Sequence, residues 1–334
     1  MAGTERALLV CAGGGLGDSL IATMVARALR SRYAAVDALT LPAHRELLER
    51  VPDVSRIFVD GGEGPAEIAA TLQSERFAAA VVTWATPRTA ELPRLARIPI
   101  RVGQARRLYS YKFTHRVTVR SEIGDVTSHW SQILLDFARA IGCDTTAAHP
   151  AVLPTECDER EAERILERVG GSENGFCIVH ATNALAPARH WPVRGWSALV
   201  AEIRRAFQLP VLLSGAAADQ TIVGEIASQS GGVSIAGAAS LGAFASLARR
   251  ARFFAGITTG AMHVAAAVGA PTVGIFPFQT DTPERWAPLG PRASVVRATF
   301  PCRPGERKET CPDYACVANL DVPRIIAAIE SLIR

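Results

Sequence analysis

ALLVCAGGGLGDSLIATMVARALR, residues 7–30, passes from an apolar run through a glycine-rich turn into a second apolar segment. The run Ala7–Cys11 predicts a buried strand, and Asp18–Arg30 predicts a helix. Strand, glycine turn and helix in this order are typical of the first unit of a parallel α/β sheet. Ligands of such sheets bind beyond the carboxyl ends of the strands, so the turn is also the first candidate for a site.

The spacing of the glycines argues against a dinucleotide site. With Gly13 and Gly15 as the first pair of the G-x-G-x-x-G pattern, the third glycine position holds Asp18. A carboxylate there would face a pyrophosphate across a helix N-terminus and repel it. We expect Gly15 and Gly17 to let another molecule approach the backbone instead, with Asp18 at the mouth of the site. An aspartate at a helix start is also a common N-cap, and the two roles can coexist.

Length and composition fit two packed domains. The chain has 334 residues, of which 49% are apolar and 20% charged, which suits two domains of roughly 150 residues each. No run of about 18 apolar residues predicts a membrane span. Residues 1–10 lack the pattern of a secretory signal, so we expect a cytoplasmic protein with reduced cysteines.

Basic residues gather between Arg88 and Arg120, where nine lysines and arginines accompany one acid, Glu91. Such a stretch attracts phosphorylated sugars, lipid head groups or nucleic acid, although a solvated basic face without a ligand would have the same sequence pattern. Aromatic residues make up only 6% of the chain and no recognition motif is present, so we do not expect nucleic-acid binding. The candidate contacts to an anionic acceptor lie in an irregular loop over residues 104–118: Arg106, Arg107 and Lys112.

The alternation of strands and helices pauses over residues 142–155 and then starts again. This segment has little periodicity and carries Pro150 and Pro154, which marks it as a linker. We therefore predict two doubly wound α/β domains, residues 1–150 and 151–334, with the active site in the cleft between them.

Two polar clusters follow predicted strands in the second half. His180-Ala181-Thr182-Asn183 is followed by Arg189-His190-Trp191-Pro192, and its hydroxyl, amide and guanidinium groups suit a diphosphate, although an ordinary capped loop is equally compatible. In Gly256–His263, a strand end, two threonines and a glycine precede a helix, which is an anion-binding arrangement. His263 could reach the same ligand, although a lone histidine is more often structural.

These pieces, in this order, resemble one family along nearly the whole chain. The family is that of the heptosyltransferases of lipopolysaccharide core assembly, glycosyltransferase family 9. The resemblance implies a GT-B fold of two Rossmann-like domains, with acceptor on the N-terminal side and donor on the C-terminal side. It also implies that the last helix, residues 322–333, packs back on the N-terminal domain. The segments that carry it are Gly17-Asp18, His180–Asn183, Arg189–Pro192, Leu213–Ala216, Thr258–Gly260 with His263, and Ala270-Pro271.

The resemblance further implies an inverting transfer in which Asp18 is the catalytic base. No Asp-x-Asp occurs in the sequence, so we expect neither a metal ion nor a cofactor. The expected donor is an ADP-sugar, with ADP-heptose as the first candidate. The expected acceptor is an anionic glycan or glycolipid such as lipopolysaccharide core. We expect the protein to meet this acceptor at the cytoplasmic face of the inner membrane. The residues carried over as donor ligands are Thr182, Asn183, Arg189, Asp219, Thr258, Thr259, Gly260 and His263.

Three positions depart from the family pattern. Thr258 stands where the family usually has aspartate, close to the donor sugar, which leaves the sugar open. Arg189 replaces a lysine and Asp219 a glutamate. A nucleotide-sugar epimerase on the same fold and a noncatalytic transferase-like subunit remain alternatives. Cys302, Cys311 and Cys316 are spaced too widely for a typical metal site, so reduced thiols or a disulfide are the expected state.

Overall fold

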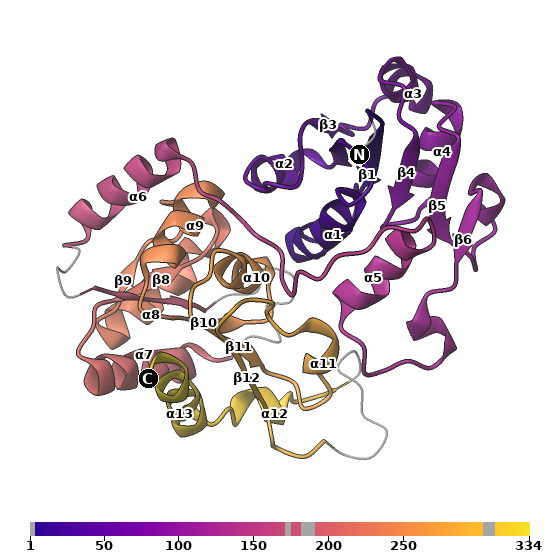
Figure 1. The fold of residues 1–334 in the computed structure, drawn as a ribbon. Helices are drawn as coiled ribbons and strands as arrows, with labels where there is room; N and C mark the ends of the chain where they lie inside the picture. Colours follow the sequence, from indigo (N-terminus) through magenta and orange to yellow (C-terminus); the bar gives the residue numbers. More distant parts are fainter. Residues whose placement is uncertain (1–3, 171–174, 182–190, 303–310) are drawn as a thin grey trace. The chain divides into compact units, whose positions relative to one another are not determined.

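The computed structural model describes residues 4–170, 175–181, 191–302 and 311–334. The chain divides into two compact units, Met1–Val152 and Leu153–Arg334. Each unit contains one six-stranded sheet, and all strand pairs in both sheets are parallel (Figure 1). The predicted α/β class with two Rossmann-like domains is confirmed.

The sheet of the first unit has the order β3-β2-β1-β4-β5-β6. This order reverses direction between β1 and β4, and the gap at such a reversal is where doubly wound sheets bind ligands. Both faces of β1 are covered, since its last four residues are all buried. The strands are β1 Arg6–Val10, β2 Ala35–Thr40, β3 Ile57–Val59, β4 Ala79–Val82, β5 Ile100–Gln104 and β6 His115–Val117.

The helices of the first unit cover the two faces of this sheet (Figure 1). Helices α1 and α5 pack together, and α3 packs with α4 on the opposite face over a core that includes Leu8, Val10 and Leu72. The bounds are α1 Leu16–Leu29, η1 Pro42–His44, α2 Arg45–Leu48, α3 Pro65–Ser74, α4 Pro87–Leu95, η2 Ser110–Lys112, η3 Arg120–Ile123 and α5 Trp130–Arg139.

The second unit repeats the arrangement with the order β12-β11-β10-β7-β8-β9. Its reversal lies between β10 and β7. The strands are β7 Cys177–His180, β8 Val211–Ser214, β9 Val233–Ser234, β10 Phe254–Ile257, β11 Thr272–Phe276 and β12 Ala293–Arg297. The helices are α6 Glu156–Arg168, α7 Val193–Phe207, η5 Ala217–Asp219, α8 Gln220–Ser230, α9 Leu241–Arg250, α10 Gly260–Ala267, α11 Pro283–Trp286, α12 Ala315–Ala318 and α13 Val322–Ile333.

The outermost strands β6 and β12 were not predicted. The sequence predicted an irregular loop over residues 104–118, yet His115–Val117 pairs with β5. Two of the three residues of β6 are exposed, so the strand has no apolar alternation to reveal it. Edge strands are commonly this short and polar.

The last helix, α13, packs on β11, β12 and α7 of its own unit. Ile325, Ile326 and Ile329 are buried there in one core with Trp196. The packing of this helix on the N-terminal domain stays a prediction. Among the described residues, no helix is both long and apolar enough to cross a bilayer.

Candidate active site

Asp18 lies in the first turn of α1, at the carboxyl end of β1. The helix begins at Leu16, two residues earlier than predicted, with Gly15 as its N-cap, so Asp18 is the third helical residue and not the N-cap. The N–H of Gly15 donates to Oδ2 of Asp18 at 2.8 Å. This bond satisfies a backbone donor at the helix start and orients the carboxylate.

The environment of Asp18 favours its protonated form. Burial raises the pKa of its carboxyl, against the lowering effects of the Gly15 N–H and the charge of His44. A carboxylate with a raised pKa binds a proton more readily than an exposed one, which is the property required of a general base.

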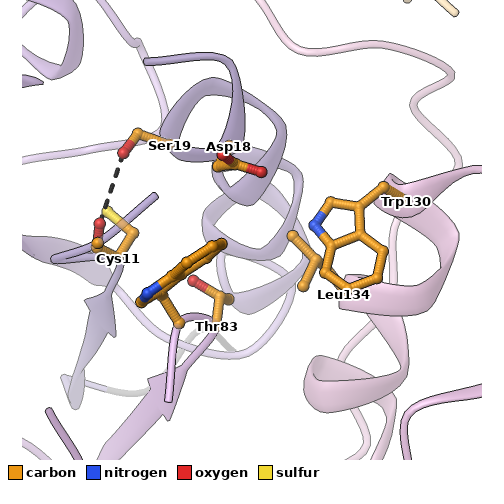
Figure 2. A pocket seen from close by; sticks show the side chains of 8 residues that line it. Cys11, Asp18, Ser19, Thr83, Trp130 and Leu134 are labelled. Carbon is orange, nitrogen blue, oxygen red and sulfur yellow. Dashed lines mark hydrogen bonds between the residues drawn. The ribbon is translucent and has the colours of Figure 1, made fainter. Parts of the chain in front are cut away.

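A small pocket opens at Asp18, between the ends of β1 and β4 where the strand order reverses. Its volume is about 10 Å³, close to the roughly 10–15 Å³ that one water requires. Figure 2 shows Asp18 on the first turn of α1, with Trp130 and Leu134 across from it on α5. The lining residues are Cys11, Gly13, Asp18, Ser19, Thr83, Trp84, Trp130 and Leu134.

The glycine turn packs against a side chain of its own unit. The indole of Trp84 lies against the turn, and a Cβ on Gly13 would overlap the ring. The approach of another molecule to Gly15 and Gly17 stays a prediction. Gly14 has φ +69°, and a Cβ there would lie 2.8 Å from Oδ2 of Asp18. The two glycines thus make room for Trp84 and Asp18 of the same unit. A Cβ on Gly15 would meet only ordinary contact, 3.6 Å from Asp18 Oδ2.

His44 is a buried neighbour that sequence reasoning missed. It ends η1, just after β2, and its Nδ1 lies 2.8 Å from Oγ of Ser19. Burial lowers the pKa of His44, while the charge of Asp18 raises it. His44, Trp84 and Trp130 carried no motif, although the rule that sites form beyond strand ends could have drawn attention to His44 after β2 and Trp84 after β4.

A larger pocket adjoins the small one and shares Thr83, Trp84, Trp130 and Leu134 with it. Its volume is about 260 Å³. Of the three basic residues predicted to meet an acceptor, Arg107 lines this pocket, whereas Arg106 and Lys112 do not. The remaining lining residues are Ala85, Gln104, Val119 and Phe137.

Several cations of the basic stretch form ion pairs, some with Glu91 inside the stretch and others with acids outside it. Arg107 pairs with Glu122 at 2.7 Å, and Lys112 pairs with Glu91 at 2.6 Å. Further pairs are Arg88–Asp60, Arg94–Glu91 and Arg120–Asp136. Asp60, Glu122 and Asp136, which lie outside the stretch, therefore offset part of its positive charge in the folded unit.

In the second unit, polar groups meet where β7 and β8 end. Nδ1 of His180 lies 3.0 Å from Oγ of Ser214, and Asp219 accepts from the N–H of Ala216 at 2.9 Å. Burial lowers the pKa of His180 to about 4, against the opposing charge of Asp219. The imidazole is therefore neutral at pH 7. Asp219, predicted to bind the nucleotide, is itself buried.

The second predicted cluster lies across the strand-order reversal, at the end of β10. Thr258 donates its N–H to the carbonyl of Ile275 at 3.1 Å. Thr259 is the N-cap of α10, yet its hydroxyl caps no backbone group, and its buried Oγ1 has no hydrogen-bond partner within the described parts of the chain. Gly260 begins the helix and His263 is buried one turn further on. A buried hydroxyl beside free helix N–H groups is suited to bind an anion.

Three predicted donor ligands, Thr182, Asn183 and Arg189, lie outside the described residues. The segment that contains them leaves β7 at Ala181 and rejoins the described chain at Trp191. Trp191 packs edge-on against Trp196, with ring centroids 5.0 Å apart, and both side chains are buried.

The cysteines form no disulfide in the described structure. Cys316 is buried in the core of the second unit, and Sγ of Cys311 lies 3.7 Å from Asp313 Oδ1. Across residues 4–170, 175–181, 191–302 and 311–334, no cluster of three His, Cys, Asp or Glu side chains could hold a metal ion.

The sequence profile of glycosyltransferase family 9 (heptosyltransferase) matches residues 66–315, which is most of the chain. The chain belongs to glycosyltransferase family 9. The family assignment confirms the resemblance read from the motifs, and it makes the chain a glycosyltransferase. Each unit has candidate site residues at its own strand-order reversal.

Solved structures of family 9 enzymes share the fold. A family 9 glycosyl transferase from Veillonella parvula aligns with a TM-score of 0.87 at 17% identity, covering 100% of this chain and 98% of that one. The ADP-heptose lipopolysaccharide heptosyltransferase II of E. coli gives 0.80 at 20% identity, with 98% of each chain covered. The E. coli heptosyltransferase WaaC, solved with ADP, gives 0.73 at 17% identity, covering 98% and 99%. No curated protein sequence matches the chain.

Proposed function

We propose that this glycosyltransferase is inverting and metal-independent, and that it moves a sugar from an ADP-sugar to a hydroxyl of an anionic glycan or glycolipid. Heptose is the first candidate sugar, and lipopolysaccharide core the first candidate acceptor. The observation that carries the proposal is the oriented, partly buried carboxylate of Asp18, which faces a pocket at the reversal between β1 and β4.

In the proposed reaction, Asp18 takes the proton of the acceptor hydroxyl while its oxygen attacks the anomeric carbon of the donor. The bond from that carbon to the diphosphate breaks, and the nucleoside diphosphate leaves with the bonding electrons. One displacement from the opposite face inverts the anomeric centre. The raised pKa of Asp18 supports its role as base, because it brings proton affinity closer to that needed near neutral pH.

The donor diphosphate is proposed to bind in the second unit, at the start of α10. The helix N-terminus and the Thr259 hydroxyl would stabilise the negative charge that develops on the leaving group. Thr182, Asn183 and Arg189 are proposed to add hydrogen bonds and a positive charge, in place of a metal ion. Gly260 and His263 stay proposed as neighbours of the same group, and Asp219 as a ligand of the nucleotide.

The proposed donor rests on the relatives. The structures named above include one solved with ADP and one whose name specifies ADP-heptose, and this supports an ADP-sugar here. Thr258, which replaces the aspartate usual in the family near the sugar, makes the sugar the part of the proposal that most needs testing. We propose a cytoplasmic location, with the acceptor presented at the inner-membrane surface.

The variant Asp18→Ala tests the proposal, because it should remove the base and leave the nucleotide site unchanged. We expect transfer from ADP-heptose to fall by about 10²–10⁴-fold, the usual contribution of a general base, with ADP stabilising wild type and variant equally in thermal shift. Loss of ADP binding with residual transfer would contradict the role of Asp18. Stabilisation by UDP or GDP instead of ADP would overturn the donor.

Two further controls separate the alternatives. Incubation of the donor without acceptor should return it unchanged, whereas an epimerase would convert it. Treatment with a chelator should leave transfer intact, and activity that is lost and then restored by a divalent metal would refute metal independence.

A further inference from the structure

The larger pocket of the first unit has an indole on two of its walls, from Trp84 after β4 and Trp130 at the start of α5. We infer that this pocket is a saccharide subsite in which a neutral pyranose ring of the acceptor stacks on Trp84, with Trp130 beside it. The inference rests on the proposed function and adds to it the class of group that is bound next to Asp18.

Trp84 has the placement of a stacking platform. One side of its indole lies against Gly13 and Gly14, where a Cβ would clash with the ring. The side chain nevertheless remains 38% exposed. A large aromatic ring that is held in place by packing and is still partly exposed can bind a ligand without much loss of side-chain entropy.

The lining matches the two kinds of surface on a sugar ring. Aliphatic C–H groups on one face of a pyranose carry partial positive charge and are attracted to the negative face of an indole. Hydroxyls around the ring edge require donors and acceptors, and Thr83 and Gln104 lie on the wall among Val119, Leu134 and Phe137. Mostly apolar walls with a few polar groups are typical of small-molecule sites.

The charge of the pocket favours a neutral ring over a phosphate. Among the described residues that line the pocket, Arg107 is the one cation, and it pairs with Glu122 at 2.7 Å. The same carboxylate accepts from Nε2 of Gln104 at 2.6 Å. A phosphate placed here would meet a cation whose charge is already offset, and it would also lie near the Glu122 carboxylate.

Size and position also fit. The volume of about 260 Å³ lies just below the roughly 300–1,000 Å³ of sites for drug-sized ligands, which suits one ring better than an oligosaccharide. The pocket adjoins the small cavity at Asp18 and shares four residues with it. A ring bound there can direct one hydroxyl toward the proposed base.

Binding can be tested without turnover by following the indole N–H signals of the ¹⁵N-tryptophan-labelled chain, which has five tryptophans. Trp84→Phe and Trp130→Phe assign two of them. Titration with methyl pyranosides of the gluco, manno and galacto series should shift the Trp84 and Trp130 signals saturably and leave Trp191, Trp196 and Trp286 unchanged. Sorbitol, an open-chain polyol, is the control and should shift neither. Equal shifts with sorbitol, no shifts with any pyranoside, or tighter binding of a hexose phosphate would overturn the inference.

Kinetics separate this inference from the proposed function. Trp84→Ala should raise the acceptor KM about tenfold, and Trp84→Phe should restore most of it, with the donor KM unchanged within about twofold. Tyr111→Ala, at an exposed aromatic outside the pocket lining, is the matched control and should have no effect. Failure of Asp18→Ala to impair transfer would refute the proposed base while leaving pyranoside binding intact. An unchanged acceptor KM in Trp84→Ala would refute the subsite alone.

Discussion

The indole of Trp84 lies against the backbone of Gly13, so closely that Gly13 has no room for a side chain. These residues follow β4 and β1, the two central strands between which the order of the sheet reverses. The contact joins the glycine turn to the opposite wall of the pocket and sets the position of the indole beside Asp18. Packing within the unit therefore determines the shape of the site.

Gly13→Ala is expected to displace Trp84. The added methyl overlaps the indole, so we expect a loss of about 1–3 kcal/mol in the free energy of unfolding and a lower kcat/KM for the acceptor. Urea denaturation and acceptor titration check the two effects. Gly64→Ala, whose Cβ would meet no atom within 4 Å, should leave acceptor kinetics near wild type. Equal effects of the two variants would argue against the Trp84 contact.

Asp18→Asn should stabilise the fold while it removes activity. Because burial raises the pKa of Asp18 above its ordinary 3.8, the folded state holds this proton more tightly than the unfolded state does. Ionisation at neutral pH is therefore destabilising, and the variant should be more stable than wild type near pH 7. The advantage should disappear as the pH falls below 3.8, which urea melts across this range would measure.

Asp125→Asn is a control that should change the free energy of unfolding at pH 7 in the opposite direction. Hydrogen bonds from Ser128 lower the pKa of Asp125 to about 2, so its ionised form contributes stability above the ordinary pKa of aspartate. This variant should be less stable than wild type at pH 7 and should retain activity. A destabilised Asp18→Asn would show that the carboxylate is needed for the fold.

Thr259→Val should weaken ADP binding without loss of stability. The Thr259 hydroxyl is buried and unpaired in the described structure, so valine removes an unsatisfied group from the free protein. We expect ADP affinity to fall about 10–100-fold, the effect of losing a hydrogen bond to a charged ligand, as measured by calorimetry. Thr272→Val removes a hydroxyl that donates to Ala270 at 2.9 Å and should show the reverse, a less stable fold with unchanged ADP affinity.

His180 should make the fold sensitive to acid. Burial lowers its pKa from 6.5 to about 4, so the unfolded state binds more protons than the folded state between these values, and stability falls as the pH drops from 6.5 to 4. The full effect is about 3 kcal/mol. His180→Gln should flatten the dependence of the unfolding free energy on pH over this range. An unchanged slope in His180→Gln would contradict this assignment.

Much of the architecture was predictable because the strands of parallel sheets have a recognisable sequence pattern. Buried central strands such as Ala79–Val82 and Phe254–Ile257 are continuous apolar runs, and their alternation with helices indicated two doubly wound domains. Strands β6 and β12 were not predicted because edge strands do not need a continuous apolar run. The surface that covers α13 cannot be read from the sequence, because an amphipathic helix has an apolar face whatever surface it packs against.

The sequence by itself determined the family, the two Rossmann-like sheets and the polar residues that follow β1, β7 and β10, because these depend on local patterns and on the order of motifs along the chain. Only the tertiary structure decided that Trp84 covers the glycine turn, that Asp18 is partly buried with a raised pKa, and which cations of the basic stretch pair with acids such as Glu122 and Glu91. The physical reason is that burial and pairing depend on neighbours brought together by folding. Spacing along the chain cannot specify them.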